Sequence, residues 1–100
     1  MARIRRLVLD VLKPVEVTTV SFAEELSDLT AVDAAAAHLV ETDREVQNVA
    51  LVVEGDALDF DSVVDCIDSL GGTLHSVDKV VCGEFVPTPH EAASDATWLR

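Results

Sequence analysis

The sequence predicts a two-layer α+β fold with four strands and two helices in the order βαββαβ. The chain has 100 residues, which is enough for one core and too short for two. Hydrophobic residues make up 49% of it, and they recur at strand spacing in some segments and at helical spacing in others. In the split βαβ arrangement both helices cover one face of an antiparallel sheet with strand order 4-1-3-2. We expect this domain over residues 1–84 and a C-terminal extension over residues 85–100.

The first half of the chain predicts a strand, a helix and a hairpin. Residues 4–12 are rich in Leu and Val and stop near Pro14, whereas residues 17–29 carry apolar side chains at helical spacing. Residues 32–40 are ambiguous, because the run from Ala34 to Ala37 has the highest helix propensity available. A polar turn over residues 42–45 and a Val-rich strand over residues 48–54 favour a hairpin instead.

The second half predicts the clearest helix and a last strand. Asp59 is placed to cap the helix, Leu58 and Val63 fit a hydrophobic staple, and Gly71-Gly72 supplies a left-handed stop. The apolar alternation over residues 74–82 is interrupted at Asp78-Lys79, which predicts a β-bulge.

The charge balance is strongly acidic. There are 19 Asp and Glu against 7 Lys and Arg, a formal net charge of -12. Concentrated salt would screen the resulting repulsion, because the Debye length falls to about 3 Å at 1 M. Only Lys13 and Lys79 carry ammonium groups, a bias typical of proteins from halophilic cytoplasm. An ordinary acidic protein is the alternative.

Composition excludes several classes of function. The basic cluster Arg3, Arg5 and Arg6 is too small for a nucleic-acid surface. No apolar run approaches the length of about 18 residues of a membrane helix, and no signal peptide is evident, so we expect a cytoplasmic protein without membrane partners. Cys66 and Cys82 lack CxxC spacing, and we interpret both as free, partly buried thiols.

Four segments together resemble one small archaeal family, domain of unknown function 211. They are RRLVLDVLKP at residues 5–14, ETDRE at 41–45, VEGD at 53–56 and LGGTLHSVDKVVCG at 70–83. The resemblance covers residues 3–84 and implies a ferredoxin-like fold without an established activity. It also implies a strand where this chain has Ala34 to Val40. Val17, the alanines of that strand and the tail beyond Gly83 depart from the family pattern.

A polar row is expected on the helix-free face of the sheet. If Leu7, Leu9 and Val11 face the helices, Asp10 faces the other way, because strand side chains alternate. Treating the first and third strands as parallel neighbours places Asp10 beside Glu54. A hairpin centred near Val46 sets His38 opposite Glu54, and the fourth strand brings His75 toward Lys13. The four candidate metal ligands are Asp10, Glu54, His75 and His38, whose oxygen and imidazole groups suit a divalent cation.

A structural interpretation competes with the metal site. Asp10 could pair with Arg6, Lys13 or a neighbouring subunit, Glu54 could simply end a strand, and His38 could be a solvated residue. The acidic helix faces have no EF-hand spacing and are interpreted as hydrated surface. The resemblance does not imply a histidine at position 38. A metal site common to the family therefore could not depend on His38.

Three classes of function remain open. The first is a non-enzymatic homo-oligomer that binds a small ligand or ion at subunit boundaries, by analogy of fold. Its self-association would use the strand edges and the helix-free face, where Val8, Leu12, Ala34, Ala36, Val40, Ala50 and Val52 predict an exposed apolar patch. The second is a divalent-metal-binding protein on the residues above. The third is an enzyme of unknown reaction, although the sequence holds no motif with a specific mechanism and predicts no cofactor besides such a cation.

Overall fold

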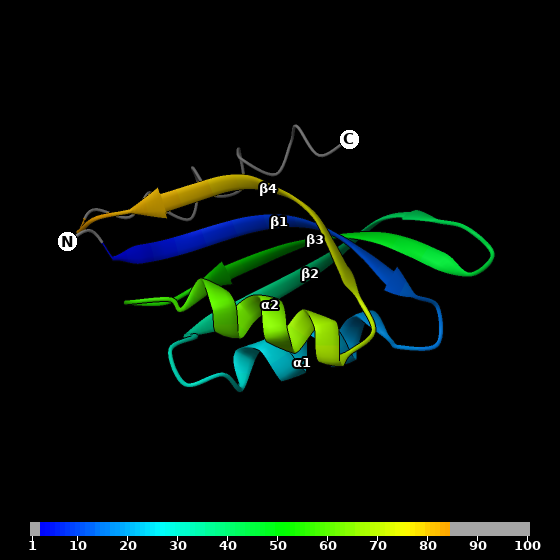
Figure 1. The fold of residues 1–100 in the computed structure, drawn as a ribbon, viewed down its shortest axis with the longest axis horizontal. Helices are drawn as coiled ribbons and strands as arrows, with labels where there is room; N and C mark the ends of the chain where they lie inside the picture. The colour runs from blue at the N-terminus through cyan, green and yellow to red at the C-terminus, as the bar shows by residue number, and fades with distance from the viewer. Residues whose placement is uncertain (1–2, 85–100) are drawn as a thin grey trace.

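The computed structural model describes residues 3–84 and confirms the predicted architecture. The elements are β1 (Ile4–Pro14), α1 (Thr19–Ser27), β2 (Ala34–Thr42), β3 (Val46–Glu54), α2 (Phe60–Ser69) and β4 (Thr73–Cys82). The sheet order is β2-β3-β1-β4, and every neighbouring pair is antiparallel. Both helices lie on one face of this sheet (Figure 1). The segment interpreted as a C-terminal extension, 85–100, lies outside the described residues.

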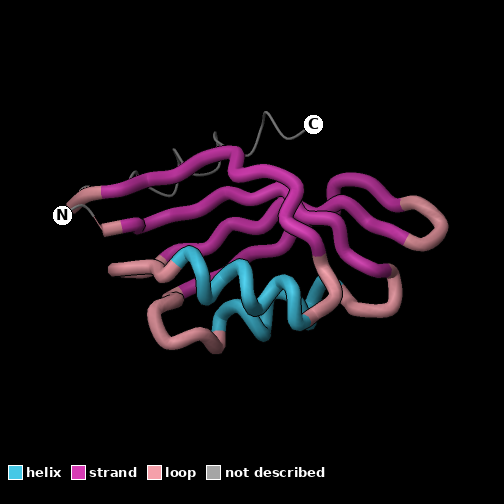
Figure 2. The backbone as a smooth tube through the Cα atoms, in the orientation of Figure 1, coloured by secondary structure: helices cyan, strands magenta, loops and turns pink. Residues whose placement is uncertain are grey.

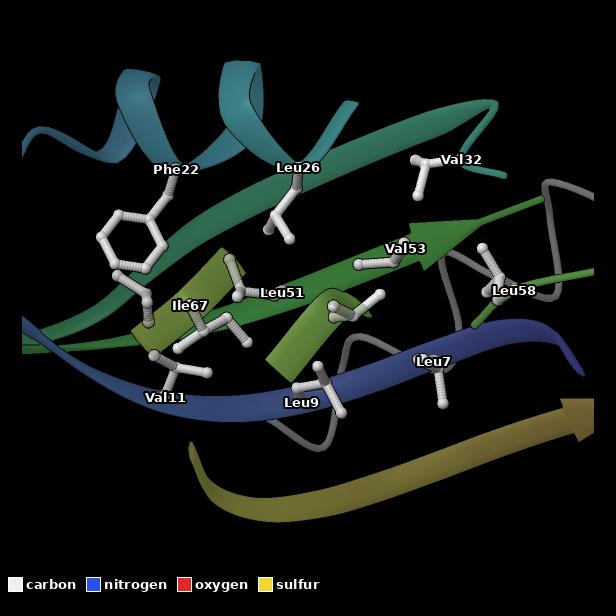
Figure 3. Close-up of a cluster of buried hydrophobic side chains, with 12 residues drawn as sticks. Leu7, Leu9, Val11, Phe22, Leu26, Val32, Leu51, Val53, Leu58 and Ile67 are labelled. Atoms are coloured by element: carbon white, nitrogen blue, oxygen red, sulfur yellow. The ribbon is translucent and has the colours of Figure 1, made fainter. Parts of the chain in front are cut away.

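The core fills the space between the sheet and the helices. Alternate residues of the two central strands point into it, and Phe22 and Leu26 of α1 and Val63 and Ile67 of α2 meet them (Figure 3). Its strand residues, all almost fully buried, are Leu7, Leu9, Val11, Val49, Leu51 and Val53. Within residues 3–84, neither helix has the length and apolar character that crossing a bilayer requires.

The helix ends combine predicted and unpredicted features. The φ of Gly71 is 83°, and the amides of Gly71 and Gly72 donate to the carbonyls of Asp68 and Ile67, as in a Schellman stop. Asp59 stands at the N-cap of α2, but its side chain caps no backbone amide; its Oδ2 accepts from Ser62 Oγ at 2.9 Å. The predicted side-chain cap at Asp59 is therefore wrong.

The alanine run is a strand, although its intrinsic propensity favours a helix. Ala35 and Ala37 face inward and pack against the core, whereas Ala34 and Ala36 are exposed. Pairing with β3 satisfies one side of the β2 backbone. Tertiary pairing therefore overrides a local helix preference of a few tenths of a kcal/mol per residue, on the order of the propensity differences between alanine and ordinary residues.

The β2–β3 hairpin extends beyond the ends of the two helices (Figure 2). The pairs run from Ala34 with Glu54 to Thr42 with Gln47, so the turn lies at Arg44 and Glu45, and the Asp43 amide donates to the Val46 carbonyl at 2.9 Å. The sequence-based centre near Val46 is therefore too late, and the partner of Glu54 is Ala34, four residues before the expected His38. A shift by an even number of residues leaves the side chains before the irregularity at Val40 on their predicted faces, because the side-chain period of a strand is two.

Two irregularities distinguish β4. Neither His75 nor Asp78 has a partner residue on β1, and the register shifts at each of them. The shift at Asp78 confirms the predicted bulge beside Lys79, and the one at His75 was not predicted. A bulge lets two successive residues face one partner and can re-aim a side chain.

Candidate site on the outer face of the sheet

The site candidates of the sequence lie on the sheet face opposite the helices, called here the outer face. The strand register arranges it in rows across β4, β1, β3 and β2. These rows are Val81–Arg6–Glu54–Ala34, Lys79–Val8–Val52–Ala36, Ser76–Asp10–Ala50–His38 and Thr73–Leu12–Asn48–Glu41. Of the candidates for metal binding, Asp10 and His38 therefore share a row with Ala50 between them, whereas Glu54 lies in another row.

Glu54 lies far from Asp10, because β1 and β3 are antiparallel rather than parallel. Glu54 pairs with Arg6, and its Oε2 accepts a hydrogen bond from Arg6 Nε at 2.6 Å. Arg6 is four residues from Asp10 along β1, which is about 13 Å of strand. The prediction that Asp10 and Glu54 lie side by side is wrong. The ion pair with Arg6 gives Glu54 a role in holding the first row together.

His38 also lies apart from the other candidates. It is opposite Ala50, not Glu54, because the hairpin turn comes earlier than expected, at Arg44 and Glu45. Ala50 separates it from Asp10, and two strand spacings amount to about 10 Å. His38 is exposed, and its expected position opposite Glu54 is wrong.

Asp10 and His75 do come together. Asp10 Oδ2 lies 3.1 Å from His75 Nδ1, and Asp10 Oδ1 accepts from Asn48 Nδ2. The bulge in β4 makes the first contact possible, since it lets both His75 and Ser76, the ladder partner of Asp10, face Asp10. The Asp10 side chain is 26% exposed and that of His75 is 66% exposed. Both Asp10 oxygens are thus engaged while much of the imidazole faces solvent.

Asn48 was not among the residues predicted for this site. Its amide also reaches the Val11 carbonyl at 3.4 Å, so it bridges a side chain and the backbone of β1. Asn48 pairs with Leu12 and lies diagonal to Asp10. Only the register of two strands distant in sequence reveals this neighbour, so no local pattern could have indicated it.

Lys13 does not pair with Asp10 or His75. It points to the helix-covered side, where it is 1% exposed, and its Nζ donates to the carbonyls of Pro14 and Val17. A buried ammonium group requires hydrogen-bond partners, and these carbonyls supply them at the turn that leads into α1. Lys13 is therefore part of the fold rather than of the outer-face site.

The residues brought together are too few for a closed metal site in one chain. Within residues 3–84 the structure contains no group of three His, Cys, Asp or Glu side chains that could hold a metal ion. Asp10 and His75 form a pair supported by Asn48. Any cation at this position needs further ligands from water or from another molecule.

The apolar patch of this face is exposed only in part. Val8 and Ala50, at 3% and 2% exposure, are buried, and Val40 and Val52 are half-buried. Leu12, Ala34 and Ala36 are exposed. The prediction of an exposed apolar patch is therefore wrong at Val8 and Ala50. The three exposed residues, Leu12, Ala34 and Ala36, are called here the open part of the outer face. They lie along β2 and near the end of β1.

A hollow adjoins the open part near the end of β1. Its volume is about 460 Å³, and it is bordered by the hairpin and the start of β4. Leu12, Pro14, Val46 and Thr73 line it together with the acidic Glu16 and Glu45. Its size falls in the range of small-ligand sites, which is about 300–1,000 Å³. Leu12 and Thr73 are each two residues from the Asp10–His75 pair, so the hollow adjoins that pair.

The two cysteines are both free thiols with different surroundings. Burial raises the pKa of the Cys66 thiol, and the nearby Glu25 carboxylate raises it further. Cys82 is exposed, so the expectation that both are partly buried is wrong for Cys82. Neither thiol forms part of the Asp10–His75 pair.

The fold and its helix-free face define a small ferredoxin-like α+β domain of the split βαβ type. A family model, DUF211, described as "Uncharacterized ArCR", matches residues 5–96. The chain belongs to this family, and the match continues through much of the segment beyond residue 84. It is also 44% identical over 95 residues to the uncharacterised protein MJ0319 of Methanocaldococcus jannaschii, covering 91% of this chain and 98% of that protein.

Proposed function

We propose that this protein is a homo-oligomeric, non-enzymatic module that self-associates through the open part of its outer face. The observation that carries the proposal is the distribution of charge. The chain has a net charge of -12, yet on the outer face of the two central strands the only carboxylates are Asp10 and Glu54. Each is engaged within the chain, Asp10 by Asn48 and His75 and Glu54 by Arg6. Over these two strands a second copy can therefore approach without meeting an unpaired carboxylate, whereas the exposed Glu41 lies at the β2 end of the fourth row.

The helices have the opposite character. Glu24, Glu25, Asp61, Asp65 and Asp68 are all exposed on α1 and α2. Repulsion between two such surfaces is strong unless salt screens it. The helix side is therefore suited to remain hydrated, and the outer face is the surface of lower electrostatic cost. The exposed Leu12, Ala34 and Ala36 supply apolar area for contact.

A charge placed in the middle of the outer face tests the proposal. Val52 lies between Val8 and Ala36 in its row, so Val52→Asp introduces an unpartnered carboxylate there. Light scattering and native mass spectrometry at high salt should show an oligomer for the unaltered chain and smaller species for the variant. Circular dichroism checks that the variant remains folded.

The matched control is Val20→Asp on α1. Val20 is 64% exposed on the helix side, so the same substitution there should leave the assembly intact. A monomeric unaltered chain at micromolar concentration would refute self-association. An oligomer that tolerates Val52→Asp and dissociates with Val20→Asp would place the contact on the helices.

Metal binding is a second candidate, favoured by the contact between Asp10 and His75. When Nδ1 of a histidine is held by a carboxylate, Nε2 is free to ligate a metal, and the carboxylate fixes the ring. The 3.1 Å contact and the support from Asn48 give His75 this arrangement. The remaining ligands would come from water or from a second copy at a subunit boundary. Glu54 and His38 are too far away to take part.

Titration with Zn²⁺ by calorimetry tests the metal candidate. His75→Ala should abolish binding, and Asp10→Asn should weaken it by about 10- to 100-fold, the usual effect of losing an orienting partner. His38→Ala is the matched control, because His38 is an exposed imidazole on the same face. Equal losses in the two histidine variants, or no loss in either, would rule out a specific site at His75.

A further inference from the structure

The two edges of the sheet differ in how they are protected. A free edge strand presents unpaired backbone amides and carbonyls, and proteins usually block such edges with bulges, prolines or charged side chains. β4 is interrupted by register shifts at His75 and Asp78 and carries Lys79. It therefore has the features that discourage another strand from pairing with it.

β2 lacks these features over most of its length. Its pairing with β3 is regular from Ala34 to Leu39, and the one register shift occurs at Val40. That regular segment contains neither proline nor lysine nor carboxylate, in a chain with 19 acidic residues. Within residues 3–84, no strand pairs with its other side. Leu39, at 44% exposure, adds an apolar side chain at its end.

We infer that the free edge of β2, from Ala34 to Leu39, is the docking strand for a second copy of this chain. The second copy would add a strand to the sheet by main-chain hydrogen bonds, which is the mode of β-strand addition. This inference rests on the proposed self-association and identifies its contact. It assigns that contact to β2 and not to the bulged, charged edge of β4.

A second copy is favoured over an unrelated partner by charge and by continuity. The exposed Ala34 and Ala36 lie on both β2 and the outer face, so one approach buries the edge and the open part of that face together. Such an approach also keeps the carboxylates of both sets of helices away from the contact, because the helices cover the other face (Figure 1). A second copy of this chain presents the same two surfaces: an outer face whose central carboxylates are paired, and helices whose carboxylates are exposed.

Hydrogen exchange of the full chain at high salt tests the contact. In a lone edge strand alternate amides point outward and exchange quickly. If the inference holds, every amide from Ala34 to Leu39 exchanges slowly in the oligomer, with the outward ones slowed by about tenfold or more relative to a monomeric form. The outward amides of β4 serve as the internal control and should stay fast.

Substitution provides a second measurement. Ala36→Lys places on β2 the kind of charge that blocks edges, and should weaken assembly at least tenfold in dilution experiments. Val80→Lys is the control on β4, where Val80 is 48% exposed. An oligomer whose β2 amides still exchange quickly would overturn the assignment to β2 and leave self-association standing. A protein that stays monomeric at all concentrations would overturn both.

Discussion

The two faces of this sheet are built from the same strands, but they differ in packing and in charge. The helix-covered face is closed by Phe22, Leu26, Val63 and Ile67, all at 1% exposure or less. The outer face mixes buried Val8 and Ala50 with exposed Leu12 and Ala36, and engages its central carboxylates in pairs. The difference shows that the closed apolar core lies under the helix layer, whereas the outer face leaves apolar side chains open to solvent, which is the basis of the self-association proposed above.

The largest expected effect comes from the same substitution made on each face. Leu26→Ala removes a fully buried side chain from the core and should cost about 2–5 kcal/mol of the free energy of unfolding. Leu12→Ala removes a leucine that is 38% exposed on the outer face, and should cost less than about 1 kcal/mol. Denaturant titrations of both variants at one salt concentration measure the two values. Equal costs would mean that the faces are equally packed.

Salt dependence separates the two faces by charge. We expect the protein to lose structure or assembly below about 0.5 M salt, because screening offsets the repulsion among its carboxylates. Replacing the exposed Asp65 and Asp68 of α2 with asparagine should lower the salt requirement, since both belong to the repelling helix surface. Thermal melts in a KCl series measure this effect.

Glu54→Gln is the corresponding control on the outer face. Glu54 is already neutralised by Arg6, so removing its charge should not relieve the need for salt. A melting temperature that stays constant from low to molar salt would contradict the halophilic interpretation. If Glu54→Gln lowered the salt requirement as much as the helix substitutions do, the two faces would not differ in charge repulsion as argued here.

The smallest expected effect concerns the two thiols. Because burial and Glu25 raise the pKa of Cys66, less of it is thiolate at any pH below that pKa, and its alkylation should be slower than that of the exposed Cys82. The rate for Cys66 should go on rising at higher pH than the rate for an ordinary free thiol such as glutathione, because its pKa is raised. Iodoacetamide kinetics on Cys66→Ser and Cys82→Ser, each keeping one thiol, measure this. Coincident pH profiles for Cys66 and glutathione would contradict it.

Sequence patterns predicted the fold because the signals were local and repeated. The helical spacing that includes Phe22 and Leu26 gave α1 its buried face, and Gly71 gave α2 its left-handed end. The alternation of Leu7, Leu9 and Val11 identified the strand face that meets the helices. At Ala34 to Ala37 local propensity indicated the wrong structure, whereas the polar turn and Val-rich strand that follow, together with the family resemblance, indicated a strand.

The candidate site was predicted less well, because a site depends on register. The sequence placed Asp10, Glu54 and His38 on the correct face, and that much follows from the two-residue period of a strand. The direction of β3 relative to β1 and the turn at Arg44 determine which of these residues are neighbours. Those choices depend on how distant segments pair, which no short pattern records. The bulge that brings His75 to Asp10, and the amide of Asn48 beside them, are decided by tertiary pairing alone.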